Sequence, residues 1–239
     1  MELLLGIIAF TTSLIAAIIG FGGGMLLIAV LPMFLSPAII IPIHGITQIA
    51  SNTSRALFSI SYVKWSLLPA FLIGSVIGTL LFGLVLYNLP TTYIPAAIGL
   101  YLLLNIWYKP FANYVSQFEN YYVIGVLQTG LGLLVGATGP LSLSVLTKQL
   151  KCKDEIIATS AVFMTLSHLA KVPIFAMLSS TLLQSGSLIL YMVIGSIAGS
   201  YCGSKLRLSS NNAKLIWIIK LTLTALAIKM LASLFISQS

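Results

Sequence analysis

Acidic side chains are scarce in this 239-residue sequence, which has four aspartates and glutamates against twelve lysines and arginines. All four acids lie near a chain end or between apolar segments: Glu2, Glu119, Asp154 and Glu155. Cation pumps, many cation channels and proton relays bind their ions through carboxylates at membrane depth. Because no apolar segment here contains a carboxylate, the sequence argues against those classes and favours an anionic ligand.

Charged residues of both signs are also rare, at 7% of the chain, whereas a soluble domain carries about 25%. Hydrophobic residues make up 59%, and the mean hydropathy is +1.08. These values predict a polytopic membrane protein, in which the net charge of +8 is a topology signal and not a nucleic-acid surface. Cys152 and Cys202 show no metal or redox spacing. The sequence therefore predicts no cofactor, no metal site and no nucleic-acid partner.

Apolar segments long enough to approach or cross a bilayer recur along the whole chain, which leaves no room for a soluble domain. They fall at about 3–35, 38–61, 66–88, 92–108, 120–147, 156–179, 183–204 and 214–236. The first segment lacks a basic region before it, so we expect a retained helix and not a cleaved signal peptide.

The two halves of the sequence resemble each other. A shift of 116 residues pairs Gly20 with Gly136, Gly23 with Gly139, Ser51 with Ser167, Asn52 with His168 and Arg55 with Lys171. A Gly-Ser-x-x-Gly pattern also occurs at 74–78 and again at 195–199. Such internal repeats are typical of secondary transporters. We expect residues 1–108 and 120–239 to be transmembrane repeats 1 and 2, with residues 109–119 as the connecting loop.

Loop cations predict how the repeats are oriented. With eight simple crossings, Lys64 and Lys109 lie on one side, and six cations lie on the other. If the first and fifth segments are instead re-entrant hairpins, all eight loop cations lie on one side, as the positive-inside rule requires. The expected fold is an all-α polytopic membrane protein with two inverted repeats. Each repeat is a broken or re-entrant helical hairpin followed by three transmembrane helices, and both termini lie outside.

Each predicted hairpin contains a break. Four glycines in the stretch Gly20–Gly24 disfavour a helix, because each costs about 1 kcal/mol relative to alanine. Backbone that leaves a helix at membrane depth must be buried in protein or line a cavity. In the second hairpin, Thr138 is expected to cap a helix that starts at Pro140. Two helix N-termini that meet in this way would form an anion site. Close helix packing at the glycines, or a kink at Thr138, are the alternatives.

Polar side chains on the second and sixth segments form matching helical faces. His44, Gln48, Asn52 and Arg55 share one face, and Ser160, Met164, His168 and Lys171 share the other. Buried charges usually face an interior path, although long cations near a helix end can also snorkel to the interface. Lys220 and Lys229 on the last segment are expected to snorkel. The histidines are candidates for helix–helix hydrogen bonds or for proton coupling.

The candidate site residues come from the breaks and from these faces. The predicted substrate-binding residues are Gly22, Gly23, Gly24, Asn52, Arg55, Thr138, Gly139, His168 and Lys171. The candidates for pathway lining or proton coupling are His44, Gln48, Ser142 and Ser144. We predict no catalytic residue and no enzyme activity, because His-Glu-x-x-His, paired aspartates and Gly-x-Ser-x-Gly are missing from the sequence.

The run Ile19-Gly20-Phe21-Gly22-Gly23-Gly24, followed by Leu31-Pro32, resembles the sulfite exporter TauE/SafE family. Chain length, hydropathy and the duplication agree over nearly the whole chain. The resemblance implies transport of sulfur-containing anions such as sulfite, organosulfonates or thiosulfate, in a bacterial or archaeal plasma membrane. The second half departs from the pattern, because Gly136–Pro140 replaces a glycine run and Lys148 follows where a proline is expected.

Together these observations predict a secondary transporter, in the direction of export, for a small anion in a lipid bilayer. An inside-negative potential drives each negative charge outward by about 2.3 kcal/mol per 100 mV, so export needs no coupling residue. An anion channel and a non-transporting membrane scaffold are the alternatives.

Overall fold

A computed structural model describes residues 1–20, 22–110, 119–178, 185–206 and 213–236. Phe21 of the glycine stretch, Arg207, and most of the expected connecting loop 109–119 lie outside the described residues. The expected breaks between segments at 179–184 and 207–212 lie outside them as well.

The described residues form helices and no β-strand. The first half contains α1 (Glu2–Ile19), α2 (Gly23–Val30), α3 (Pro37–Leu57), α4 (Leu68–Tyr87) and α5 (Ile94–Trp107). The second half contains α7 (Tyr121–Val135), α8 (Pro140–Gln149), α9 (Lys153–Leu169), α10 (Lys171–Leu178), α11 (Gly186–Lys205) and α12 (Ala213–Ile236). Four stretches are long and apolar enough to cross a membrane: Glu2–Ile19, Trp65–Tyr87, Lys153–Ile174 and Gly186–Lys205. The prediction of an all-α polytopic membrane protein is confirmed.

Both apolar segments that were expected to be interrupted contain two helices, α1 with α2 and α7 with α8. The first helix of each pair ends at a glycine, Gly20 with φ +97° and Gly136 with φ +80°. Residues that have a Cβ atom rarely adopt a positive φ, whereas glycine does so at no steric cost. The glycine pair at a spacing of 116 residues therefore marks the ends of α1 and α7.

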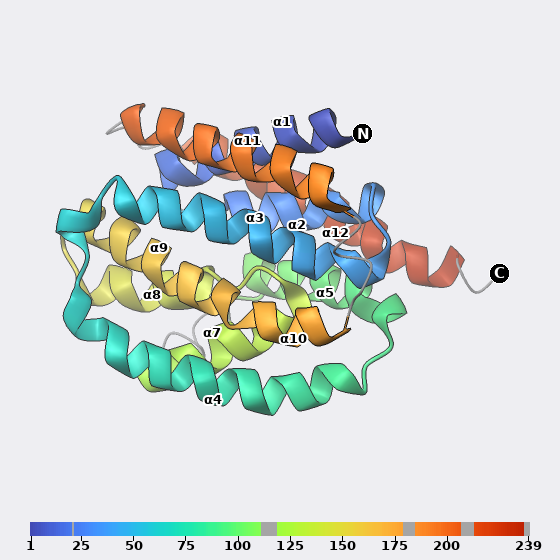
Figure 1. The fold of residues 1–239 in the computed structure, drawn as a ribbon, viewed down its shortest axis with the longest axis horizontal. Coiled ribbons are helices and arrows are strands. Elements are labelled where there is room, and N and C mark those ends of the chain that lie inside the picture. The colour runs from blue at the N-terminus through green and yellow to red at the C-terminus, as the bar shows by residue number, and fades with distance from the viewer. Residues whose placement is uncertain (21, 111–118, 179–184, 207–212, 237–239) are drawn as a thin grey trace.

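The long helices pack in reciprocal pairs between the two halves. Helix α1 lies along α11, and α7 lies along α4, at opposite sides of the molecule in Figure 1. Between them α3 packs against α9, and α5 packs against α12. Each half therefore contributes the same elements to the same kind of contact.

The two Gly-Ser-x-x-Gly patterns form these reciprocal contacts. Gly74 and Gly78 of α4 lie against the backbone of Tyr122 and Val126 in α7. In the other pair, α11 brings its two glycines against equivalent positions of α1, namely Gly195 against Gly6 and Gly199 against Phe10. Small residues allow helix backbones to approach this closely in a membrane, where no hydrophobic effect drives the helices together.

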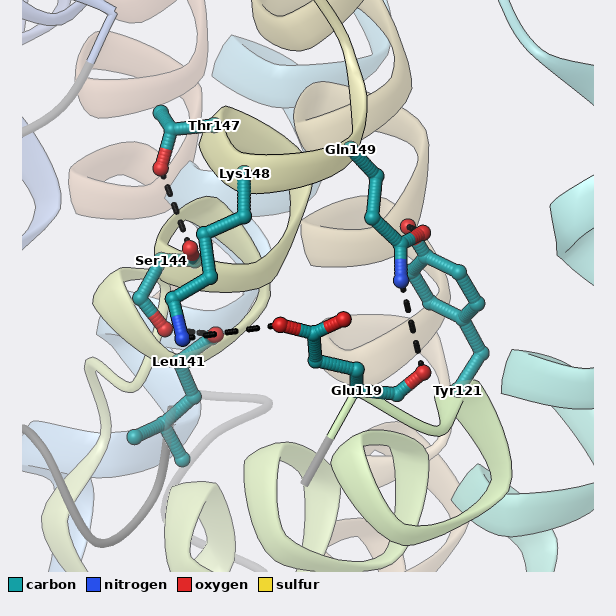
Figure 2. A network of polar contacts seen from close by, with 7 residues as sticks. All are labelled: Glu119, Tyr121, Leu141, Ser144, Thr147, Lys148 and Gln149. Atoms are coloured by element: carbon teal, nitrogen blue, oxygen red, sulfur yellow. Dashed lines mark hydrogen bonds and ion pairs between the residues drawn. The ribbon is translucent and has the colours of Figure 1, made fainter. Parts of the chain in front are cut away.

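Polar contacts join the connecting segments at one end of the helices. Lys64 Nζ lies 2.5 Å from Glu155 Oε1, and Lys148 Nζ lies 3.6 Å from Glu119 Oε1. Figure 2 shows the second contact together with Tyr121, whose hydroxyl donates to Gln149 Oε1 at 2.7 Å. The start of α7 and the end of α8 therefore meet. In Figure 1, α1 begins and α12 ends at the opposite end of the molecule from the α3–α4 connection.

Candidate functional site

A cavity of about 30 Å³ lies where the two breaks face each other. This volume holds about two water molecules. The first half lines it with Gly22, Gly24, Met25, His44 and Gln48, and the second half lines it with Ala137, Gly139, Pro140, Ser160, Met164 and His168. At a shift of 116 residues, Gly24 pairs with Pro140, His44 with Ser160, and Gln48 with Met164. Equivalent positions of the two halves therefore meet across one cavity.

Both breaks contain backbone N–H groups that have no hydrogen-bond acceptor among the described residues. These are the N–H groups of Gly23 and Gly24 at the start of α2, and those of Thr138 and Gly139 before α8. The first N–H groups of a helix have no carbonyl in their own helix to bind, and the helix dipole makes this end partly positive. The cavity thus lies beside two helix ends that favour negative charge.

Thr138 does not cap α8, so this prediction was wrong. Gly139 holds the N-cap position, and the Thr138 hydroxyl donates to the carbonyl oxygen of Gln128 at 2.6 Å. Gln128 also accepts the Ser142 N–H at its Oε1, at 3.0 Å, and its Nε2 donates to Ser167 Oγ at 3.1 Å. A side chain of α7 therefore reaches across the break and satisfies the first turn of α8.

Arg55 is buried, with 2% of its surface exposed, so it does not snorkel. Its guanidinium donates to the Ala16 carbonyl oxygen at 2.9 Å and to Asn52 Oδ1. Asn52 Nδ2 in turn donates to Gln48 Oε1 at 3.3 Å. This chain of hydrogen bonds occupies the oxygen of the Gln48 amide and leaves its Nε2 as a donor beside the cavity.

Lys171 is the equivalent cation of the second half and is also 2% exposed. Its ammonium donates to the Gly136 carbonyl oxygen at 2.7 Å, at the C-terminal end of α7, and contacts His168 Nδ1 at 3.2 Å. An ammonium group only donates, so Nδ1 of His168 accepts and its Nε2 carries the ring hydrogen. A cation at a helix C-terminus is also stabilised by the helix dipole.

Two buried polar atoms that line the cavity have no partner among the described residues. His44 Nε2 donates to the Gly24 carbonyl oxygen at 2.9 Å, which leaves His44 Nδ1 unpaired. Ser160 Oγ, at the matching position of the other half, is unpaired as well. The His44 and His168 rings lie edge to face, 5.4 Å apart. Unpaired buried polar atoms are costly, and a ligand or water in the cavity would pair them.

The predicted site residues therefore separate into distinct groups. Six of the candidate residues line the cavity: Gly22, Gly24, His44, Gln48, Gly139 and His168. Asn52, Arg55 and Lys171 lie behind it and hold the lining residues. Ser160, Met164 and Pro140 were not among the predicted site residues. The signal for Ser160 and Met164 was their place on the helical face that carries His168.

Gly23 serves helix packing. A Cβ at this position would collide with the carbonyl oxygen of Thr12 and would lie 2.7 Å from the Ala16 Cβ. The alternative of close packing therefore describes Gly23, whereas Gly22 and Gly24 line the cavity. Ser142 donates to the Gly139 carbonyl oxygen at 3.3 Å and lines neither the cavity nor the pocket described next.

A larger pocket of about 350 Å³ adjoins the cavity and shares Gly22, Met25 and Pro140 with it. It lies between the starts of α2 and α12, the end of α5 and one side of α8 from Pro140 to Thr147. Ser144 and Lys220 line it, whereas Lys229 does not. The pocket therefore extends from the breaks towards the helix ends next to Lys109 and Lys148.

The family model of the sulfite exporter TauE/SafE family matches residues 5–230, which is nearly the whole chain. A search of the curated proteins and a search of the solved structures each returned no match. The matched region includes both breaks, the cavity and the larger pocket. The chain therefore belongs to the sulfite exporter TauE/SafE family and is a multi-pass membrane transporter for sulfur-containing anions.

Proposed function

We propose that the chain is a secondary transporter that exports a small sulfur oxyanion, such as sulfite, an organosulfonate or thiosulfate, across a prokaryotic plasma membrane. The cavity between the two breaks carries this proposal. Its lining has backbone and side-chain donors from both halves, and no carboxylate is among the residues that line it. The membrane potential would itself drive an anion outward.

The lining donors are neutral, and the cations stand behind them. Gln48 Nε2 and the protonated Nε2 of His168 would donate to the oxyanion, beside the N–H groups of Gly24 and Gly139. Arg55 and Lys171 fix these donors through Asn52 and through His168 Nδ1. A transport site must bind its ion and then release it, and neutral donors bind less tightly than a direct ion pair.

Alternating access between two inverted halves would carry the anion across. The reciprocal packing of α1 with α11 and of α7 with α4 supports two repeats at 1–108 and 120–239. The 30 Å³ cavity has to widen for a four-atom or five-atom oxyanion with its hydrogen-bond partners. Rocking of one half against the other about the fixed site would widen it, as in other transporters with repeats.

Transport by purified protein in liposomes tests this proposal. Sulfite, thiosulfate, a short alkyl sulfonate and sulfate are offered in turn, with and without the same anion on the trans side. We expect saturable flux of at least one sulfur anion and faster exchange when the anion is present on the trans side. Flux without trans-stimulation would identify an anion channel, and no flux of any of them would indicate a scaffold.

The proposed orientation has a separate test. A cysteine is placed at Asn88, between α4 and α5, in a background with Cys152→Ser and Cys202→Ser. If both termini lie outside, the proposed topology places the α4–α5 connection outside as well. A membrane-impermeant thiol reagent should therefore label whole cells. If the cysteine is labelled only when the reagent has access from the cytoplasm, the protein has the opposite orientation.

A further inference from the structure

We call the larger pocket the vestibule. One charged residue, Lys220, lines it. Its walls are mostly apolar, and its polar lining residues are Asn105, Ser144, Thr147 and Lys220. Its volume of about 350 Å³ is within the range of pockets that admit small ligands. Since it shares Gly22, Met25 and Pro140 with the cavity, an anion in the vestibule is next to the two breaks.

Lys220 differs from the nearby cation Lys148. Lys148 lies 3.6 Å from the Glu119 carboxylate, so its charge is compensated (Figure 2). Among the described residues, the Lys220 ammonium makes no ion pair and no hydrogen bond. No acidic residue lines the vestibule with it. A cation between apolar walls attracts anions more strongly than one in open water, because low-dielectric walls focus its field.

The hydroxyls of the vestibule have no hydrogen left to donate to an incoming anion. Ser144 Oγ donates to the Leu141 carbonyl oxygen at 2.8 Å, and Thr147 Oγ1 donates to the Ser144 carbonyl oxygen at 3.0 Å. Both hydrogens are therefore committed within α8. Lys220 is the charged group left to meet an incoming ligand.

We propose that Lys220 is an anion-capture residue, which concentrates the transported anion in the vestibule before it enters the cavity between the breaks. The direction of this step rests on the proposed export, in which the vestibule faces the cytoplasm. Lys220 would thus govern the apparent affinity for the anion, while the cavity governs its passage.

Charged thiol reagents test the capture step without any transport. In a background with Cys152→Ser and Cys202→Ser, Ser144→Cys is reacted in detergent with sulfonatoethyl methanethiosulfonate, an anion. It is also reacted with trimethylammonioethyl methanethiosulfonate, a cation. The measured quantity is the ratio of the two reaction rates. We expect Lys220→Gln to lower the anion-to-cation ratio about three- to tenfold, since one nearby charge acts oppositely on the two reagents.

Lys229→Gln is the matched control, because Lys229 lies on the same helix and does not line the vestibule. It should leave the ratio unchanged, and Lys220→Arg should restore it. An equal ratio in the parent and in Lys220→Gln would overturn the proposal, and so would a Ser144→Cys thiol that neither reagent reaches. These outcomes do not depend on flux, so they are separate from failure of the transport assay.

In liposomes the same variants separate capture from passage. For the anion that the parent carries, Lys220→Gln should raise KM severalfold with little change in kcat. The effect should fade as the ionic strength rises. A fall in kcat with unchanged KM would assign Lys220 to passage and contradict the capture role.

Discussion

The two breaks occupy equivalent positions, yet different interactions hold them. The first break is closed by backbone packing, where the α-carbon of Gly23 lies against the carbonyl of Thr12. In the second break the equivalent residues are Gly139 and Gln128, and Gln128 bridges the break with side-chain hydrogen bonds. The same helix break is therefore stabilised by close backbone packing at a glycine in the first half and by the side-chain amide of Gln128 in the second half.

The cations show the same contrast. Arg55 binds the Ala16 carbonyl oxygen and acts on the cavity through Asn52 and then Gln48. Lys171 binds the Gly136 carbonyl oxygen at the end of α7 and touches the lining residue His168 directly. The charge of Lys171 therefore contacts a lining residue directly, whereas one side chain, Asn52, lies between Arg55 and the lining residue Gln48. We expect the two halves to tolerate different substitutions.

Gly23→Ala and Gly139→Ala should separate the two breaks most strongly. The Cβ in Gly23→Ala meets backbone atoms, which cannot move aside, and we expect a loss of about 3 kcal/mol in the free energy of unfolding. In Gly139→Ala the Cβ meets the Met164 sulfur at 2.6 Å, at the end of a flexible side chain. That variant should lose less than about 1 kcal/mol. Thermal unfolding in detergent measures both, and equal losses would refute the contrast.

Gln128→Leu should cause the second-largest loss in the free energy of unfolding. Thr12→Val is the equivalent substitution in the first half. Gln128→Leu leaves the Ser142 N–H and the Ser167 hydroxyl without this partner, which should cost about 2 kcal/mol. The Thr12 hydroxyl donates only to Ile8 and Ala9 within its own helix, so Thr12→Val should change stability by less than about 0.5 kcal/mol. Denaturant unfolding in micelles distinguishes them. A larger loss in Thr12→Val would show that hydrogen bonds also hold the first break.

Lys171→Met and Arg55→Met test the closer placement of charge in the second half. In Lys171→Met the Gly136 carbonyl oxygen and the His168 ring lose their donor, and we expect kcat/KM for the transported anion to fall about tenfold. In Arg55→Met the Asn52–Gln48 hydrogen bond remains, so a fall of about threefold is expected. Initial rates in liposomes measure both. Lys171→Arg is the control that keeps the charge, and a larger defect in Arg55→Met would reverse the order.

The sequence predicted the parts of this arrangement that depend on local chemistry. The run Gly20–Gly24 predicted the first break, because a run of glycines does not continue a helix, and the shift of 116 residues pointed to the second break at Gly136. The periodic spacing of His44 and Gln48 placed both on one face, and both line the cavity. The shift of 116 residues also matched positions that prove to lie opposite each other, His44 and Ser160 among them.

The sequence could not predict which polar residues face the cavity and which stand behind it. Asn52 and Arg55 share the helical face of Gln48, and only long-range contacts, such as that between Arg55 and Ala16, turn them away. Thr138 looked like a cap because of its neighbours in the chain, but Gln128, ten residues before it, accepts its hydroxyl hydrogen. Lys220 resembles Lys229 in sequence, and only the packing of α12 distinguishes them.

Ser160→Ala should have the smallest effect, and it tests whether the anion contacts the Ser160 side of the cavity. The Ser160 hydroxyl has no partner among the described residues, so its removal should leave the unfolding temperature unchanged. If the hydroxyl donates to the transported anion, KM should rise about threefold, the value of one neutral hydrogen bond. Ser13→Ala is the matched control, because its hydroxyl is also buried and unpaired but does not line the cavity. Equal KM values in the two variants would mean that the anion passes the cavity without contacting Ser160, and would leave Gln48, His168 and the backbone N–H groups as its donors.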